Sequence, residues 1–330
     1  MKIFIDPQER FVMKIPDEWY FTTDHHDGDA KKQPYSFETY DKRNLAFNIS
    51  YREKLPEQNF KIEQQQKGKN NLDFIEREED SMKIWVTNIE GNGVVLITCI
   101  YDKRISSKQK CIENNRAQEV VKSLLIFNEQ TRQFLIPKLR WNRFLLSCAA
   151  SIDLVNRAYE NSSFIELVVL LANRIDAVLR QSIILDKQLK ERSDELDVSL
   201  IYQSENDPPI MEKIVYKKAL NSGLLDQKTY DELIRLYNIR NKVVHRYIIS
   251  DIRTADIIQL VWLYKQMNDK LGDDLIALEE KQFKEQIGIY KGKEAPDSEV
   301  SDEMITELIA NIRDKHGNRK VNEGITIEKK

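Results

Sequence analysis

The sequence predicts an α+β domain followed by an all-α helical bundle. Before residue 105, apolar and polar residues alternate at a period of two in several short runs, as in half-buried β-strands. After that point, apolar residues recur at three- and four-residue steps, as in amphipathic helices. A chain of 330 residues is also long enough for two hydrophobic cores. We therefore expect an α+β domain over residues 1–130, a helical domain over 131–275, and a charged, partly disordered tail over 276–330.

The first domain should contain an antiparallel sheet and one helix. Glu90–Gly93 has the composition of a hairpin turn between two strands. Apolar residues at helical spacing within Ser106–Phe127 indicate an amphipathic helix that covers one face of the sheet. The expected strands are Arg10–Ile15, Tyr35–Tyr40, Leu45–Tyr51, Met82–Ile89 and Val94–Tyr101.

A strand from Phe11 to Ile15 leads into a Pro16-x-x-Trp19 corner, and this corner resembles PsbP-like domains. Those domains do not share one activity, so the resemblance implies no catalytic residue. We expect this domain to be a sensing or docking module. Residues 24–29, with the sequence Asp-His-His-Asp-Gly-Asp, contain possible metal ligands. Adjacent residues point apart in an extended chain, which favours a solvated acidic loop over a metal site.

The second domain should begin with a connection, Asn128–Lys138, in which Pro137 marks the start of a helix. Polar residues between Ser193 and Pro209 indicate a loop. Asp226 or Thr229 should start a later helix, which carries the residues described next. Further helices are expected over Leu139–Tyr159, Phe164–Arg192, Ile210–Leu220 and Thr254–Lys270, with another possible over Ser301–Arg313.

Arg240 interrupts an apolar stripe of that later helix. A guanidinium does not lose its proton, and burying it unpaired costs several kcal/mol, so this position requires a carboxylate or an anionic ligand. Asn241 and His245 are four residues apart and share the adjoining face. The other members of the stripe are Leu233, Leu236, Tyr237, Val243, Val244 and Tyr247.

Arg240-Asn241, followed by His245 and Tyr247, resembles the R-N-x-x-x-H-x-Y motif of HEPN-domain ribonucleases, and the HepT-type toxins among them most closely. The resemblance covers residues 140–270. It implies an all-helical bundle in which two protomers bring their motifs together to form a metal-independent RNase site. In some HepT-like proteins the corresponding tyrosine is modified by a partner nucleotidyltransferase.

An acidic residue followed four positions later by a basic one also occurs on an earlier helix of that family. Asp176 and Arg180 fit this pattern, with Asp and Arg where Glu and Lys are usual. Asp176 is the one carboxylate in its apolar stripe, as Arg240 is the one cation in the other stripe. We therefore hypothesise that Asp176 and Arg240 form an ion pair between the two helices. The alternative is two independent, partly exposed charges.

The motif suits RNA transesterification, in which a 2'-hydroxyl attacks the adjacent phosphate. Histidine can move protons near neutral pH, and an arginine fork can hold phosphoryl oxygens, so His245 and Arg240 receive these roles. Asn241 would orient His245 or the phosphate, and Tyr247 would pack or contact substrate. Because efficient catalysis needs both an acid and a base, one His245 per chain implies a homodimer. Further phosphate-binding residues would be Arg235, Lys217, Lys218, Lys242, Arg246 and Arg253.

Charge and cysteine content suggest the setting of this activity. The formal charge is about +3 over residues 131–270, against about −2 before them and −4 after them. The three cysteines, Cys99, Cys111 and Cys148, have no metal-ligand spacing and favour a reducing compartment. The sequence suggests neither a signal peptide nor a membrane span, so a cytoplasmic protein without membrane partners is expected. We expect no cofactor and no metal.

Three functions remain open. The first is an endoribonuclease of toxin or antiviral-defence type, with an RNA substrate and an antitoxin or regulatory partner. The second is a non-catalytic interaction protein that dimerises or binds RNA. The third is a nucleotide-binding regulator, because an Arg-His-Asn face can bind phosphates without cleaving them.

Overall fold

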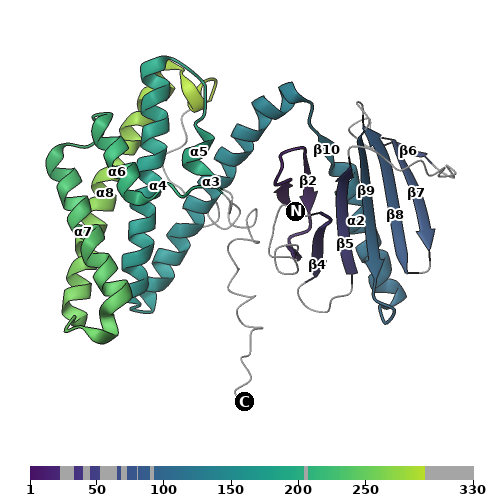
Figure 1. Ribbon diagram of the computed structural model, residues 1–330, viewed down its shortest axis with the longest axis horizontal. Helices are drawn as coiled ribbons and strands as arrows, with labels where there is room; N and C mark the ends of the chain where they lie inside the picture. Colours follow the sequence, from purple (N-terminus) through teal and green to yellow (C-terminus); the bar gives the residue numbers. More distant parts are fainter. Residues whose placement is uncertain are drawn as a thin grey trace. The chain divides into compact units, whose positions relative to one another are not determined.

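A computed structural model describes residues 1–22, 33–39, 45–52, 65–67, 73–79, 81–89, 93–203 and 207–293. The described residues form two compact units, residues 1–134 and residues 135–293. Figure 1 shows strands and one helix in the first unit and helices in the second. Helix α3, Glu129–Glu160, includes the position at which the two units divide.

The first unit contains two antiparallel sheets. The larger has the strand order β3-β4-β5-β9-β8-β7-β6, and the smaller has the order β1-β2-β10. All five expected strands are present. Glu90–Gly93 was expected to turn the chain between β8 and β9, and Ile89 indeed pairs with Gly93. The strands are β1 Lys2–Ile5, β2 Phe11–Ile15, β3 Trp19–Phe21, β4 Tyr35–Thr39, β5 Leu45–Arg52, β6 Gln65–Lys67, β7 Asp73–Glu79, β8 Met82–Ile89, β9 Gly93–Tyr101 and β10 Leu125–Ile126.

Helix α2, Ser107–Ser123, covers one face of the larger sheet (Figure 1). Ser106 caps it by accepting a hydrogen bond from the backbone N–H of Gln109. Its buried Ala117 and Val120 belong to the same core as Phe47 and Ile97 of the sheet. The expected helix was too long at its C-terminal end, because Leu125–Ile126 leave the helix and pair with β2.

All the secondary-structure elements that the structure describes in the second unit are helices. The sequence suggested that Pro137 starts a helix, but Pro137 lies inside α3. Asn128 occupies the cap position instead, where its side chain accepts a hydrogen bond from the backbone N–H of Thr131. The remaining helices are α4 Phe164–Glu191, α5 Val198–Ile201, α6 Glu212–Asn221, α7 Gln227–Arg246, η1 Tyr247–Ile249, α8 Thr254–Glu285 and η2 Gly288–Tyr290.

The core of this unit lies between α4, α6, α7 and α8. Of the two expected starts for α7, Asp226 is the cap, since its carboxylate accepts a hydrogen bond from the Thr229 N–H at 2.6 Å. Burial of one side of α7 fixes which residues of the motif face inward. The fully buried residues of this core include Leu167, Ile175, Val215, Tyr216, Leu236 and Tyr264.

Residues 276–290 belong to the folded unit, although the sequence suggested a partly disordered tail. Helix α8 continues to Glu285, and Gln282 is completely buried. Gln282 donates to the Leu185 carbonyl and to Gln188 Oε1 of α4, at 3.0 and 2.9 Å. This amide network attaches the end of α8 to α4. The possible helix at 301–313 and the acidic loop at 24–29 lie outside the described residues.

Gly288→Ala is expected to destabilise the protein more than Gly223→Ala. Both glycines have positive φ, +69° and +80°, where a Cβ costs about 1 kcal/mol. A Cβ at Gly288 would also lie 2.5 Å from Gln188 Oε1 and 2.6 Å from Gln282 Nε2, whereas one at Gly223 would have no neighbour within 4 Å. Overpacking should therefore add about 1–3 kcal/mol at Gly288. Urea denaturation measures both, and equal losses would contradict the packing of η2 against α4.

Candidate functional site

Arg240 is the centre of a polar cluster on the inner side of α7, with only 13% of its side chain exposed. Its Nη1 donates to Glu212 Oε1 at 2.5 Å, and its Nε and Nη2 donate to Asn241 Oδ1 at 3.3 and 3.0 Å. Its guanidinium carbon also lies 4.8 Å from the centre of the Tyr237 ring. These contacts hold the guanidinium from three sides.

Glu212, the carboxylate that pairs with Arg240, is the first residue of α6. A helix N-terminus favours negative charge, so this position suits a carboxylate. Its second oxygen, Oε2, accepts a hydrogen bond from the Tyr216 hydroxyl at 3.2 Å. Burial raises the pKa of Tyr216 and also that of nearby Tyr264, so both phenols stay protonated. Glu212 thereby connects α7 to the core.

The expected ion pair between Asp176 and Arg240 is replaced by two others. Asp176 pairs with Arg180 on its own helix, with Oδ2 and Nε 2.6 Å apart, while Arg240 pairs with Glu212. Residues four apart on a helix are neighbours, so Arg180 reaches Asp176 without help from the tertiary fold. Burial raises the pKa of Asp176, an effect that Arg180 and, more weakly, Arg240 oppose. Asp176 therefore interacts electrostatically with Arg240 but is not its ion-pair partner.

Arg180 has a structural position rather than one suited to substrate. Besides Asp176, it donates to the carbonyls of Leu200 and Ile210, at 2.9 and 2.7 Å. Leu200 belongs to α5, and Ile210 lies near the end of the segment that joins α5 to α6. Arg180 thus holds the approach to α6, the helix that positions Glu212.

Glu212 is not among the predicted site residues, although the sequence carries a signal for it. Glu212, Val215, Tyr216 and Ala219 follow one another at three- and four-residue steps, so Glu212 is the lone carboxylate of an apolar stripe. The same reasoning had selected Asp176. Two stripes each contained one carboxylate, and the periodicity could not decide which of them faces Arg240.

His245 lies in the last turn of α7 and is exposed to solvent. It shares a face with Asn241, one turn earlier. None of the described residues hydrogen-bonds to its imidazole. Because Asn241 Oδ1 accepts from Arg240, the amide orients the guanidinium, and its Nδ2 has no acceptor among the described residues.

Tyr247 was expected to continue the apolar stripe of α7, but it does not. Helix α7 ends at Arg246, and Tyr247 begins η1 with 41% of its surface exposed. Ile248 and Ile249 follow it and are 94% and 80% exposed, so apolar side chains reach solvent beside His245. Because the helix ends here, spacing along it no longer determines which way these side chains face.

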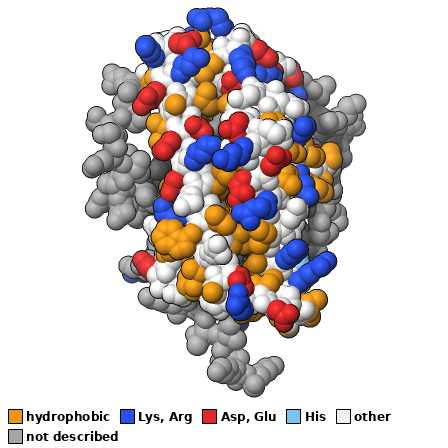
Figure 2. Space-filling model, turned by 90° about the vertical axis from the view of Figure 1, so that its left-hand side faces the viewer, with side chains coloured by type: hydrophobic (Ala, Val, Ile, Leu, Met, Phe, Trp, Pro, Cys, Tyr) orange, Lys and Arg blue, Asp and Glu red, His pale blue; other side chains and the backbone are white. Residues whose placement is uncertain are grey.

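The expected RNA-binding cations fall into two groups. Arg235 pairs with Glu232 through two short contacts, 2.6 and 2.8 Å, and Arg253 pairs with Asp256, so their charges are locally neutralised. The other group is exposed, and the described residues supply no salt-bridge partner for it: Lys217, Lys218, Lys242 and Arg246. Figure 2, which views the molecule from the left-hand side of Figure 1, shows basic, acidic and hydrophobic side chains interspersed over that face.

This chain matches no protein-family model, no curated protein and no solved structure. Its chemistry must therefore be inferred from the geometry of the cluster. Within the described parts of the chain, no three His, Cys, Asp or Glu side chains are grouped to hold a metal ion. The helices described there also lack the combined length and apolarity that crossing a bilayer requires.

Arg240 keeps capacity to bind an anion. Its contacts with Glu212 and Asn241 use three of the five N–H donors of a guanidinium, which leaves one on each terminal nitrogen. Two such donors can bind two oxygens of one phosphoryl group. The cluster therefore fixes the orientation of the guanidinium without exhausting its donors.

Glu212→Ala should destabilise the protein by about 3 kcal/mol, because it leaves a largely buried guanidinium without its carboxylate. Glu232→Ala is the matched control. It removes a carboxylate whose arginine partner, Arg235, is 49% exposed, so the loss should stay below about 1 kcal/mol. Chemical denaturation of both variants, of Arg240→Ala and of the double variant Glu212→Ala with Arg240→Ala tests the pair. Additive losses in the double variant would show that Glu212 and Arg240 are not coupled.

Proposed function

We propose that the helical unit is a metal-independent endoribonuclease of the HEPN type, acting as a homodimer. The observation that carries this proposal is the division of the motif on α7. Arg240 is held rigidly with two donors unused, while His245 is exposed to solvent a little more than one turn further along. A fixed phosphate-binding group and an accessible imidazole are the two parts that RNA transesterification needs.

In the proposed reaction, the 2'-oxygen of RNA forms a bond to the adjacent phosphorus while the bond to the 5'-oxygen breaks. His245 of one protomer takes the proton from the 2'-hydroxyl, and the partner's His245 gives a proton to the departing 5'-oxygen. Arg240 stabilises the negative charge that develops on the phosphoryl oxygens. The products are a 2',3'-cyclic phosphate and a 5'-hydroxyl, and no metal takes part.

The dimer is part of the proposal because one imidazole cannot serve as both acid and base in a single step. Ile248 and Ile249, next to the motif, expose apolar surface that a two-fold contact would bury. Such a contact would bring two copies of His245 together. The first unit would then serve as the sensing or docking module of a toxin or antiviral-defence protein, and an antitoxin or regulatory partner would control the RNase.

A non-catalytic protein that binds RNA or nucleotides is the second candidate. It is favoured by one observation: no described residue hydrogen-bonds to His245 to orient its ring. A cluster of cations around Arg240 would bind phosphates without needing an oriented imidazole. Loss of the imidazole separates the two candidates, since it abolishes cleavage but has little effect on phosphate binding.

Purified protein should cleave mixed cellular RNA in excess EDTA and leave 2',3'-cyclic phosphate ends. His245→Ala should lower the rate at least about a hundredfold, the scale of general acid–base catalysis. Arg240→Lys, which keeps the charge but removes the fork, should lower it as well. Glu280→Gln, at an exposed position of α8, serves as a control away from the motif. RNA binding with equal traces from the parent and His245→Ala would support the non-catalytic candidate.

Ile248→Asp should convert the dimer to a monomer and abolish cleavage, because two carboxylates cannot be buried together at the two-fold contact. Ile276→Asp introduces the same charge at a 52% exposed isoleucine of α8 and should alter neither property. Sedimentation and cleavage are measured on the same samples. A monomeric parent that still cleaves RNA would contradict the composite site.

A further inference from the structure

Two lysines of α6 lie over two tyrosines of α7. Lys213 Nζ is 4.5 Å from the centre of the Tyr237 ring, and Lys217 Nζ is 5.4 Å from that of Tyr230. The lysines are four residues apart, so each occupies the same face of its helix one turn from the other. Contact with a ring restrains a lysine ammonium that would otherwise move freely at the surface. We call these four side chains the lysine–tyrosine ladder.

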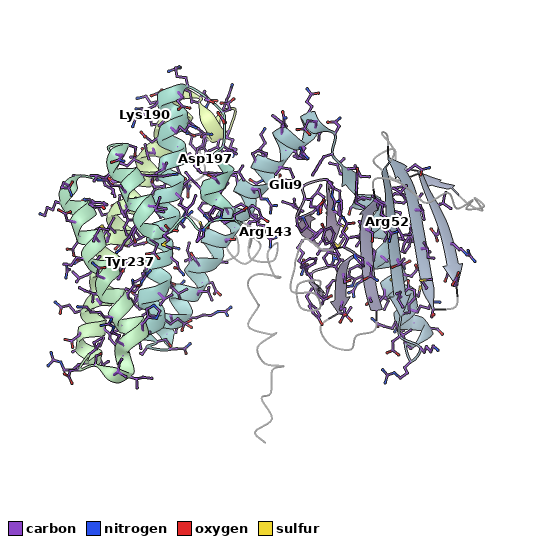
Figure 3. All side chains as sticks on the ribbon, in the orientation of Figure 1. Glu9, Arg52, Arg143, Lys190, Asp197 and Tyr237 are labelled. Atoms are coloured by element: carbon purple, nitrogen blue, oxygen red, sulfur yellow. The ribbon has the colours of Figure 1, made fainter. Side chains whose placement is uncertain are left out.

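The ladder is continuous with the Arg240 cluster. The ring of Tyr237, which is labelled in Figure 3, contacts both cations. Its centre lies 4.8 Å from the Arg240 guanidinium carbon and 4.5 Å from Lys213 Nζ. Two cations therefore share one aromatic ring. Because each cation lies within 4.8 Å of the same ring centre, the two like charges are near enough to repel each other, and an anion bound beside them would relieve that repulsion.

Like Lys218, Lys242 and Arg246, the two ladder lysines keep an unneutralised charge among the described residues. The described residues provide no carboxylate within salt-bridge distance of Lys213 or Lys217. Lys190 pairs with Asp186, and Lys265 pairs with Asp269. Helix α6 thus presents a short row of exposed positive charge that begins beside Arg240 and has no local counter-charge. Such a row attracts the phosphates of a nucleic acid.

We propose that the lysine–tyrosine ladder binds the backbone of single-stranded RNA on one side of the cleaved phosphate. The inference rests on the proposed function, since Arg240 marks the position of that phosphate. Four residues of helix advance by about 6 Å, comparable to the step between phosphates in an extended strand. Lys213 would contact the phosphate next to the one at Arg240, and Lys217 the one beyond it.

A single strand fits this arrangement better than a duplex. Attack by the 2'-oxygen requires it to stand in line with the departing 5'-oxygen, and the regular A-form backbone prevents that alignment. Bases of a single strand are also free to lie against aromatic rings and arginine planes, whereas those of a duplex are stacked inside it. The ladder therefore predicts that the substrate is single-stranded. It also predicts that the RNA backbone runs from Arg240 past Lys213 to Lys217.

The test measures binding to full-length His245→Ala protein, which holds RNA without cutting it. A fluorescent single-stranded oligonucleotide and its blunt duplex are titrated at several salt concentrations. In single strands each lost phosphate contact should reduce the slope of log affinity against log salt by about 0.7. We expect that reduction for Lys213→Ala and for Lys217→Ala, and roughly twice as much for the double variant.

Lys265→Ala is the matched control, because it removes an exposed lysine that pairs with Asp269 on α8. It should leave the slope unchanged. Thermal denaturation confirms that each variant is folded. Slopes for Lys213→Ala and Lys265→Ala that both equal the parent's would overturn the ladder as an RNA path, and equal affinity for strand and duplex would overturn the single-strand assignment.

Cleavage assays in EDTA on the parent and on the Lys213→Ala and Lys217→Ala variants with His245 intact separate this inference from the proposed catalysis. Binding that depends on the ladder, in a protein whose parent fails to cleave RNA in EDTA, would leave the ladder standing and reject the endoribonuclease. Cleavage that is indifferent to Lys213→Ala and Lys217→Ala would do the reverse. If neither form of RNA binds, both proposals fail.

Discussion

The ion pair between Arg240 and Glu212 is the contact on which the rest of the site depends. A guanidinium remains charged at any pH that a folded protein tolerates, so burying one requires a fixed counter-charge. Glu212 meets that requirement from the start of α6, and Tyr216 holds its second oxygen. The orientation of α6 against α7 is therefore coupled to the position of the guanidinium. Arg180, by bonding to Leu200 and Ile210, fixes the chain that leads into α6.

A change in burial along α7 separates the roles of the motif residues. Arg240 lies inside, Asn241 is half-buried and in contact with it, and His245 is in solvent. A phosphate-binding group benefits from this rigidity, because its orientation is established before substrate arrives. A proton-transferring group benefits from access to solvent and substrate. One helix supplies both environments because Val243 is its last residue in the core, whereas the residues from Val244 onward, including Ile248 and Ile249, are exposed.

Local pairing decides which cations can act on a distant anion. Arg235 pairs with Glu232 three residues earlier on α7, and Arg253, which caps α8, pairs with Asp256 three residues later. The nearby carboxylate largely cancels the charge of each arginine. Lys213 and Lys217 have tyrosine rings beneath them instead, which restrain the ammonium groups without neutralising them. The distribution of effective positive charge thus differs from the distribution of basic residues. Lys213 and Lys217 keep their charge where α6 and α7 meet, next to Arg240.

Sequence by itself determined the two classes of structure, because strand and helix periodicities of two and 3.6 residues are local properties. It also showed that Arg240 needs a counter-charge and that Asp226 could cap α7. Short strands such as β1 and β10 escaped detection, since two to four residues carry little periodicity, and β10 also pairs with a strand that is distant in sequence, β2. Only the tertiary structure decided that Glu212, rather than Asp176, faces Arg240. Each carboxylate lies in an apolar stripe, and the packing of α6 between α4 and α7 selects between them, because an ion pair forms with the charge that the fold brings within reach.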